Sequence, residues 1–116
     1  MVVNDLGGSA EGEGADVSVA DQVVGEIKKA GGAAVPNGDS VADPQGAERI
    51  IKTAIDNFGR VDCVVNNAGI LRDRIFHRMS WSDWHDVINV HLNGSFNMAR
   101  GSRTISATRT AARWCT

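Results

Sequence analysis

Apolar residues recur along this chain with two different spacings, which predict alternating strands and helices. Three short apolar runs have the length and composition of buried strands, namely 1–4, 33–35 and 61–65. Three longer segments carry an apolar residue at every third or fourth position, as amphipathic helices do: 19–30, 44–58, and from Ser80 or Ser82 to about Arg100. Parallel strands need helical crossovers, so this order predicts an α/β fold with a parallel sheet.

The segments between these elements carry signals of helix ends and loops. Lys28 and Lys29 precede a Gly-Gly pair, and Gly59 follows the second helix, which are favourable residues at helix C-termini. Residues 7–16 are rich in glycine and acidic side chains, which predicts a polar loop that does not pack.

Length and composition limit what the chain can be. With 116 residues, 42% of them hydrophobic and 22% charged, one folded domain is expected. The net charge of −2 argues against a nucleic-acid surface. We find no apolar run long enough to span a membrane and no signal peptide. The two cysteines lack metal-ligand spacing, so we expect no metal, no structural disulfide and a cytoplasmic protein.

Polar or small residues follow each predicted strand, at the edge where ligands bind in doubly wound sheets. Asp5 follows the first strand, where its carboxylate either accepts both hydroxyls of an adenine ribose or caps the turn into the next glycines. Asp39 and Ser40 follow the second, where they either face an adenine or form an Asx-type turn. Both interpretations remain open for all three residues.

The third strand ends in the tetrapeptide Asn66-Asn67-Ala68-Gly69, which is the sharpest signal in the chain. Small residues at Ala68 and Gly69 would let the backbone pass close to a flat ligand, and the two amides could tie the strand end to neighbouring backbone. An ordinary turn explains Gly69 but not two consecutive asparagines after an apolar run.

These residues resemble the short-chain dehydrogenase/reductase family. The stretch "VDCVVNNAGI" is similar to the motif of that family's fourth strand, and the stretches "VVNDLGG", "NNAGILRDR" and "VHLNGSF" resemble its multifunctional-enzyme branch, the (3R)-hydroxyacyl-CoA dehydrogenase domains. The resemblance covers about residues 1–100 and implies a Rossmann-like fold. It also implies hydride transfer between NAD and a small-molecule alcohol or acyl-CoA substrate, in an enzyme that forms a homo-oligomer.

The resemblance assigns roles to the strand-end residues. Asp5 would hold the adenosine ribose and select NAD over NADP, because no arginine stands beside it to receive a 2′-phosphate. Asp39 and Ser40 would face the adenine. A further set would flank the adenosine and the nicotinamide ribose: Asn66, Ala68 and Gly69. His91 stands where the family has a helix asparagine of its proton relay, and is either a catalytic candidate or a histidine packed on a helix.

Several family features are missing from the sequence. It contains neither the glycine-rich TGxxxGxG loop that receives the pyrophosphate nor any tyrosine, which acts as the family's general acid/base. The chain is therefore expected to begin at the family's second strand, and a catalytically inactive fragment, acting at most in protein association, is the alternative interpretation. The strand over 61–65 would then either pair beside Val2-Val3 or keep open edges.

Other residues have two interpretations each. Trp81 and Trp84 either line an acyl pocket near 70–79 or pack the start of the last helix on the sheet. The charge run 72–74 is either a solvated loop or a site for CoA phosphates. Residues 101–116 lack apolar periodicity and are expected to be a disordered tail. Our hypothesis is that they are read out of frame, and resequencing the locus would test it.

Overall fold

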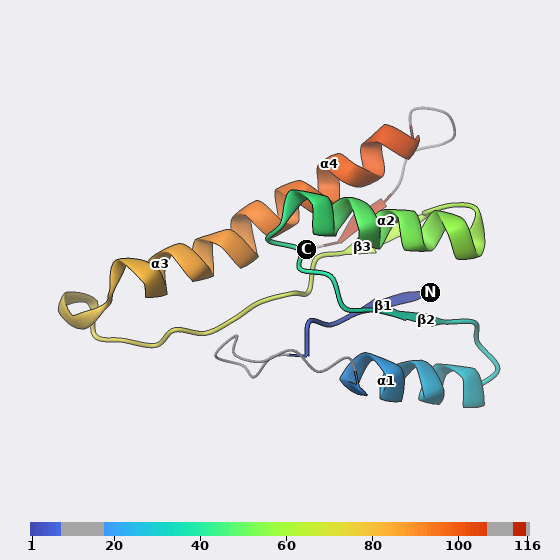
Figure 1. Ribbon diagram of the computed structural model, residues 1–116, viewed down its shortest axis with the longest axis horizontal. Coiled ribbons are helices and arrows are strands. Elements are labelled where there is room, and N and C mark those ends of the chain that lie inside the picture. The colour runs from blue at the N-terminus through green and yellow to red at the C-terminus, as the bar shows by residue number, and fades with distance from the viewer. Residues whose placement is uncertain (8–17, 107–112, 116) are drawn as a thin grey trace.

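The computed structural model describes residues 1–7, 18–106 and 113–115 (Figure 1). Its strands are β1 (Val2–Asn4), β2 (Val35–Asn37), β3 (Cys63–Val65) and β4 (Arg113–Cys115). Its α-helices are α1 (Ser18–Lys29), α2 (Pro44–Phe58), α3 (Trp81–Ile88) and α4 (Gly94–Ser106). Two short turns complete the set: the 3-10 turn η1 (Phe76–Arg78) and the π-helical segment η2 (Asn89–Asn93). The loop predicted over 7–16 lies outside the described residues from 8 onward.

The predicted helix over 44–58 is confirmed, and its ends have the expected chemistry. The carboxylate of Asp43 accepts hydrogen bonds from the backbone N–H groups of Gln45, at 3.2 Å, and Gly46, at 2.9 Å. Pro44 stands in the first turn, where its missing N–H has no cost. Gly59 closes the helix with φ of 75°, a left-handed conformation that glycine adopts readily.

The second strand lies two residues further along than predicted. The ladder pairs Val2 with Val35 and Asn4 with Asn37, so Pro36 falls inside the strand. The N–H groups of residues 35 and 37 point towards β1, as the 2.9 Å bond from Val35 N to Met1 O shows for the first. The missing N–H of Pro36 therefore belongs to the outer side, where an edge strand tolerates proline.

The predicted last helix is continuous, although it changes pitch. It begins after Ser80, whose hydroxyl accepts the N–H of Asp83 at 3.0 Å while Asp83 accepts the N–H of Ser80. The π-helical segment then inserts a wider turn between α3 and α4. The helix ends at Ser106 rather than near Arg100, and β4 also lies within the predicted tail. Residues 107–112 and 116 lie outside the described part of the chain.

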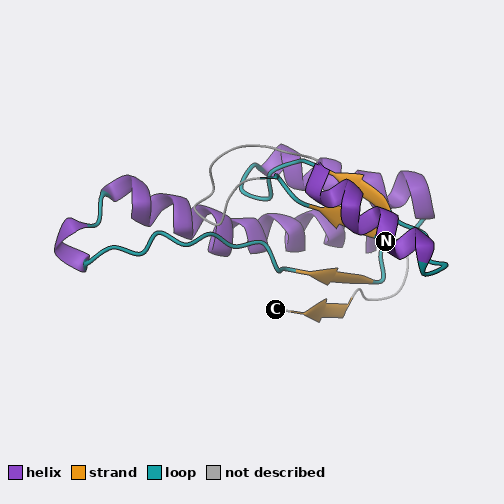
Figure 2. Cartoon of the chain, turned by 90° about the horizontal axis from the view of Figure 1, so that it is seen from below, coloured by secondary structure: helices purple, strands orange, loops and turns teal. Residues whose placement is uncertain are grey.

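The strands form two parallel pairs, β1–β2 and β3–β4. Strand β3 therefore does not pair beside Val2-Val3, as one of the two expectations had it. It does not keep two open edges either, because β4 pairs with one of its edges. The first pair lies between α1 and α2 (Figure 1), and Figure 2 shows β3 and β4 side by side and apart from that pair. A buried apolar cluster joins α2, β3 and α4, namely Ala47, Ile50, Ile51, Val64 and Met98.

The helical rod of α3, η2 and α4 extends well beyond the strands (Figure 1). The chain measures 47 × 33 × 21 Å along its principal axes, and the rod accounts for the elongation. No helix in the described ranges is long and apolar enough to cross a lipid bilayer.

Candidate cofactor site

A network of amides ties together the carboxyl ends of β1 and β2. The side-chain nitrogen of Asn4 donates to the carbonyl of Asn37 at 3.2 Å, to its side-chain oxygen at 3.0 Å and to the carbonyl of Asp39 at 2.9 Å. The Asn37 amide in turn donates to Asp39 Oδ2 at 3.0 Å and to Thr53 Oγ1 at 3.1 Å. One half-buried network thus fixes both strand ends against α2.

Asp39 is held by this network rather than directed outward. Its Oδ1 pairs with Nε of Arg49 at 2.6 Å, and its Oδ2 accepts the Asn37 amide. The hydrogen bond from Arg49 lowers the pKa of the Asp39 carboxyl below its usual value, and the Asn37 bond adds to this while burial opposes it. With both oxygens engaged, the geometry favours the Asx-type turn, since the N–H of Asp39 also binds Asn37 Oδ1 at 2.8 Å.

Asp5 and Ser40 each make a short-range turn contact. Asp5 Oδ1 accepts the N–H of Gly7 at 2.7 Å, and the hydroxyl of Ser40 accepts the N–H of Ala42 at 3.2 Å. Because β1 and β2 are paired, the residues that follow them lie at one edge of this sheet. The capping interpretation of Asp5 therefore has a physical basis, and a turn contact through one oxygen is compatible with ligand binding through the other.

The segment after β3 carries the other predicted residues. Asn66 is half-buried, whereas Ala68 and Gly69 are exposed. A Cβ atom built on Gly69 would lie 2.7 Å from Cε1 of His91, so glycine here permits the close approach of the histidine ring, and its predicted role beside the cofactor stays a prediction.

His91 binds the backbone of this segment. Its Nε2 lies 3.1 Å from the N–H of Ile70 and 3.0 Å from the carbonyl oxygen of the same residue. A neutral ring protonated on Nδ1 accepts the N–H, whereas a ring protonated on Nε2 donates to the carbonyl. His91 stands in η2, and π-helical turns of this kind occur frequently at functional sites. This contact makes His91 a positioning residue for the loop, and its predicted catalytic role stays a prediction.

The predicted site residues therefore fall into two groups. Asp5, Asp39 and Ser40 follow the β1–β2 pair, while the Asn66–Gly69 segment and His91 belong to the β3 side. The network between Asn4 and Asn37 was not predicted from the sequence. Its only signal was an asparagine at the end of each of the first two strands.

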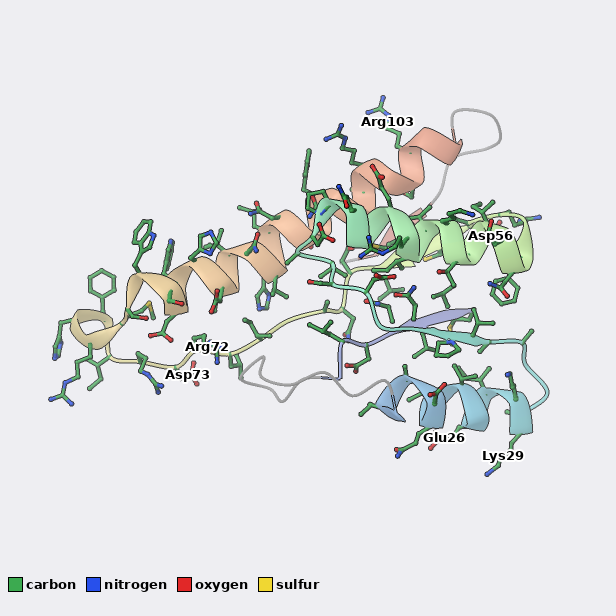
Figure 3. All side chains as sticks on the ribbon, viewed as in Figure 1. Glu26, Lys29, Asp56, Arg72, Asp73 and Arg103 are labelled. Atoms are coloured by element: carbon green, nitrogen blue, oxygen red, sulfur yellow. The ribbon has the colours of Figure 1, made fainter. Side chains whose placement is uncertain are left out.

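The structure shows the surroundings of the charge run 72–74 and of the two tryptophans. Arg72 lies on the loop beside the rod (Figure 3), and its guanidinium is 3.7 Å from the carboxylate of Asp86 in α3. Its side chain is 17% exposed, so Arg72 is not a fully solvated residue. Trp81 and Trp84 are 80% and 50% exposed, so the interpretation in which they pack on the sheet is wrong.

The strand ends carry groups of the kinds that recognise nucleotide hydroxyls and base edges. These are the carboxylate of Asp5 and the hydroxyl of Ser40 on the β1–β2 side, and the amide of Asn66 on the β3 side. Among the described residues, no three His, Cys, Asp or Glu side chains gather as metal ligands would. Parallel strands with helical crossovers and polar strand ends define a Rossmann-like α/β protein.

Comparison with known proteins gives the family. The model of the short chain dehydrogenase family matches residues 13–109, which is most of the chain. The chain belongs to the short-chain dehydrogenase family, so the resemblance and the α/β Rossmann-like fold inferred from the sequence are confirmed.

Individual relatives agree with this result. A short-chain type dehydrogenase/reductase of Mycobacterium tuberculosis is 55% identical over 88% of this chain, and the mouse peroxisomal multifunctional enzyme type 2 is 54% identical over the same share. A crystal structure of a short chain dehydrogenase from Mycobacterium avium superposes with a TM-score of 0.79 and 42% identity over 96% of this chain. The chain spans 36% of the first relative, 14% of the mouse enzyme and 41% of the M. avium protein.

Proposed function

We propose that this chain forms part of an NAD-dependent oxidoreductase whose substrate is a 3-hydroxyacyl-CoA or a similar secondary alcohol. Membership of the short-chain dehydrogenase family supports the reaction class. Similarity to the mouse multifunctional enzyme and to the peroxisomal hydratase-dehydrogenase-epimerase of Neurospora crassa, which is 52% identical over 102 residues, supports a dehydrogenase reaction. The resemblance of the stretches "NNAGILRDR" and "VHLNGSF" to (3R)-hydroxyacyl-CoA dehydrogenase domains supports the acyl-CoA substrate.

The observation that carries the cofactor preference is the position of Asp5. It is half-buried directly after β1, and its Oδ1 is fixed by the N–H of Gly7. A carboxylate there can accept ribose hydroxyls and repels a 2′-phosphate. The residue after Asp5 is the apolar Leu6, and the guanidinium of Arg49, which joins the strand-end network, pairs with Asp39. In contrast, the gluconate 5-dehydrogenase of Burkholderia cenocepacia, which has a TM-score of 0.80 to this chain at 26% identity, was solved with NADP and tartrate.

When bound, the nicotinamide cofactor would supply the hydride acceptor for oxidation of the carbinol carbon. Asp5 would hold its ribose, and the backbone of the Asn66–Gly69 segment would lie beside it, in a position that the contact of His91 with Ile70 fixes. The 116 residues contain no tyrosine, so a proton-transferring tyrosine of the family type would have to come from outside them.

Cofactor preference tests the proposal directly. Saturation-transfer NMR with the full chain and equal concentrations of NAD and NADP should give a stronger transfer to the adenosine protons of NAD. This method detects weak ligands, and binding is expected to be weak because the sequence has no glycine-rich phosphate loop. Equal or stronger transfer to NADP would contradict the NAD preference, and no transfer to either would contradict cofactor binding by this chain.

Association into a homo-oligomer is a second part of the proposal, and the exposed face of the rod supports it. Large apolar side chains on it are solvent-exposed, namely Trp81, Trp84, Leu92 and Phe96. A patch of this kind marks a protein–protein interface more often than a solvated surface. Sedimentation equilibrium should show a dimer or larger species that dissociates in a Trp81→Ser/Phe96→Ser variant. A chain that stays monomeric at every concentration would contradict it.

The cytoplasmic location expected from the composition is also part of this proposal. The balanced charge and ordinary hydrophobic content support it. Imaging a fluorescent fusion of the chain in its own cell would test it, and fluorescence confined to an organelle or a membrane would contradict it.

A further inference from the structure

Two asparagines of this chain precede a glycine, and the structure holds their side chains in different ways. The steps are Asn37-Gly38, at the end of β2, and Asn93-Gly94, in the helical rod. At such a step the backbone nitrogen of the glycine can attack the side-chain carbonyl carbon of the asparagine, since glycine has no Cβ atom to hinder the approach. The attack closes a succinimide ring and releases the side-chain nitrogen as ammonia. The surroundings of each amide therefore decide how reactive the step is.

The side-chain amide of Asn37 is fixed in one orientation. Its nitrogen donates to Asp39 Oδ2 at 3.0 Å and to Thr53 Oγ1 at 3.1 Å. A carboxylate only accepts hydrogen bonds, so the nitrogen and not the oxygen of this amide faces Asp39 Oδ2. The amide oxygen accepts two hydrogen bonds, from the backbone N–H of Asp39 at 2.8 Å and from Nδ2 of Asn4 at 3.0 Å.

These two donors are placed as the donors of an oxyanion hole are. When a nucleophile attacks Cγ of Asn37, negative charge develops on Oδ1, and donors about 2.7–3.1 Å from that oxygen stabilise the charge. The ladder with β1 ends at Asn37, so the N–H of Gly38 lies outside the hydrogen bonds of the sheet. Asn37 thus combines a polarised carbonyl group with a nucleophile that the sheet does not hold.

The second step, Asn93-Gly94, is held by the helix instead. The N–H of Gly94 donates to the carbonyl oxygen of Asn89, so this nitrogen is engaged in the π-helical segment. The Asn93 amide nitrogen donates to Asn89 Oδ1 at 3.0 Å. Attack on Asn93 requires the helix to open, which makes this step an internal control within the same chain.

We propose that Asn37 is a self-modification site, at which the folded chain converts asparagine into aspartate or isoaspartate by deamidation. The Gly38 nitrogen loses its proton to a solvent base and forms the new C–N bond, while Nδ2 takes up a proton from water and leaves as ammonia. One water molecule then opens the succinimide at either of its carbonyl carbons. Each product adds a negative charge beside Asp39 and removes a hydrogen bond that Asp39 accepted, and like charges this close repel. The reaction therefore loosens the strand ends from α2.

Peptide mapping by mass spectrometry tests the proposal on the full chain, kept folded in mildly alkaline buffer. Trypsin separates the two steps, because residues 30–49 and 79–100 fall in different peptides. In the folded chain, Asn37 should convert at least about tenfold faster than Asn93. In guanidinium chloride both lose their surroundings, so conversion of Asn37 should slow and the two rates should become similar. Equal rates in the folded chain, or faster conversion of Asn37 in the denaturant, would overturn the proposal.

An Asn4→Ala variant tests whether the network activates Asn37 or protects it. The substitution removes one of the two donors to Oδ1, so conversion of Asn37 should slow by about tenfold, the effect of one lost hydrogen bond. An unchanged or higher rate would contradict activation by the network.

The matched control is Asn57→Ala, which should leave the rate at Asn37 unaltered. Asn57 is an exposed residue of α2, and its amide donates to the carbonyl oxygen of Thr53 at 2.8 Å. Circular dichroism checks that both variants fold, and the comparison of Asn37 with Asn93 in the unmodified chain needs no variant. No nucleotide is present, so the outcome is independent of the proposed cofactor preference.

Discussion

Substituting Gly46 with alanine is expected to lower the free energy of unfolding by about 3 kcal/mol, because it overpacks a buried backbone contact. Gly46 is buried in the first turn of α2, and a Cβ atom there would overlap the backbone carbonyl oxygen of Ser40. It would also lie 3.3 Å from the Asp43 carboxylate that caps the helix. To remove this overlap, the loop before α2 would have to move. That movement would displace Ser40 and weaken the Asp43 cap of the helix.

The matched control is Gly25→Ala in α1. A Cβ atom on Gly25 meets no atom within 4 Å, and the residue is inside a helix. Alanine should therefore stabilise the chain by about 0.5–1 kcal/mol through its better helix propensity. Urea unfolding followed by circular dichroism measures both variants. If Gly46→Ala unfolds at the same urea concentration as the unmodified chain, the close approach of α2 to Ser40 is not present in solution.

Substituting Asp5 with alanine should weaken NAD binding by about tenfold to a hundredfold, the effect of losing one hydrogen bond to a charged group. Asp5→Asn should keep part of the affinity, since an amide oxygen still accepts one ribose hydroxyl and the N–H of Gly7. Titrating each variant with NAD and following the NMR chemical shifts of the protein measures the change in affinity for NAD.

The control for this substitution is Asp56→Ala. Asp56 lies on α2, where it pairs with Lys52 at 2.6 Å, and its side chain is 56% exposed (Figure 3). Removing a surface pair of this kind changes stability by less than about 1 kcal/mol and should leave NAD binding unaltered. Unchanged NAD affinity in Asp5→Ala, with folding intact, would remove Asp5 from the site.

Local signals made much of the fold predictable. The apolar spacing and Gly59 predict the bounds of helix α2, which match the structure, and the structure adds the N-terminal cap at Asp43. The Asn66–Gly69 motif also identified the family correctly from a few residues. These features are determined by residues that are adjacent in the chain, so they can be predicted from the sequence.

The remaining features depend on contacts between distant segments. The apolar run alone ends the second strand at Val35, and only the direction of the ladder to β1 shows that Pro36 fits within it. Strand β4 has no apolar alternation and exists through its pairing with β3. The contact between His91 and Ile70 joins residues 21 positions apart, so the need for glycine at position 69 has no local signature.

The proline in β2 also bears on how copies of this chain could polymerise. Fibril growth by strand stacking needs a receptive edge on each side of the growing unit. In the β1–β2 pair, the outer edge of β2 lacks the donor that Pro36 would otherwise supply. A misfolded copy that stacks on β1 would leave an outer β2 edge that lacks this donor, so growth of the sheet beyond a pair of copies is disfavoured.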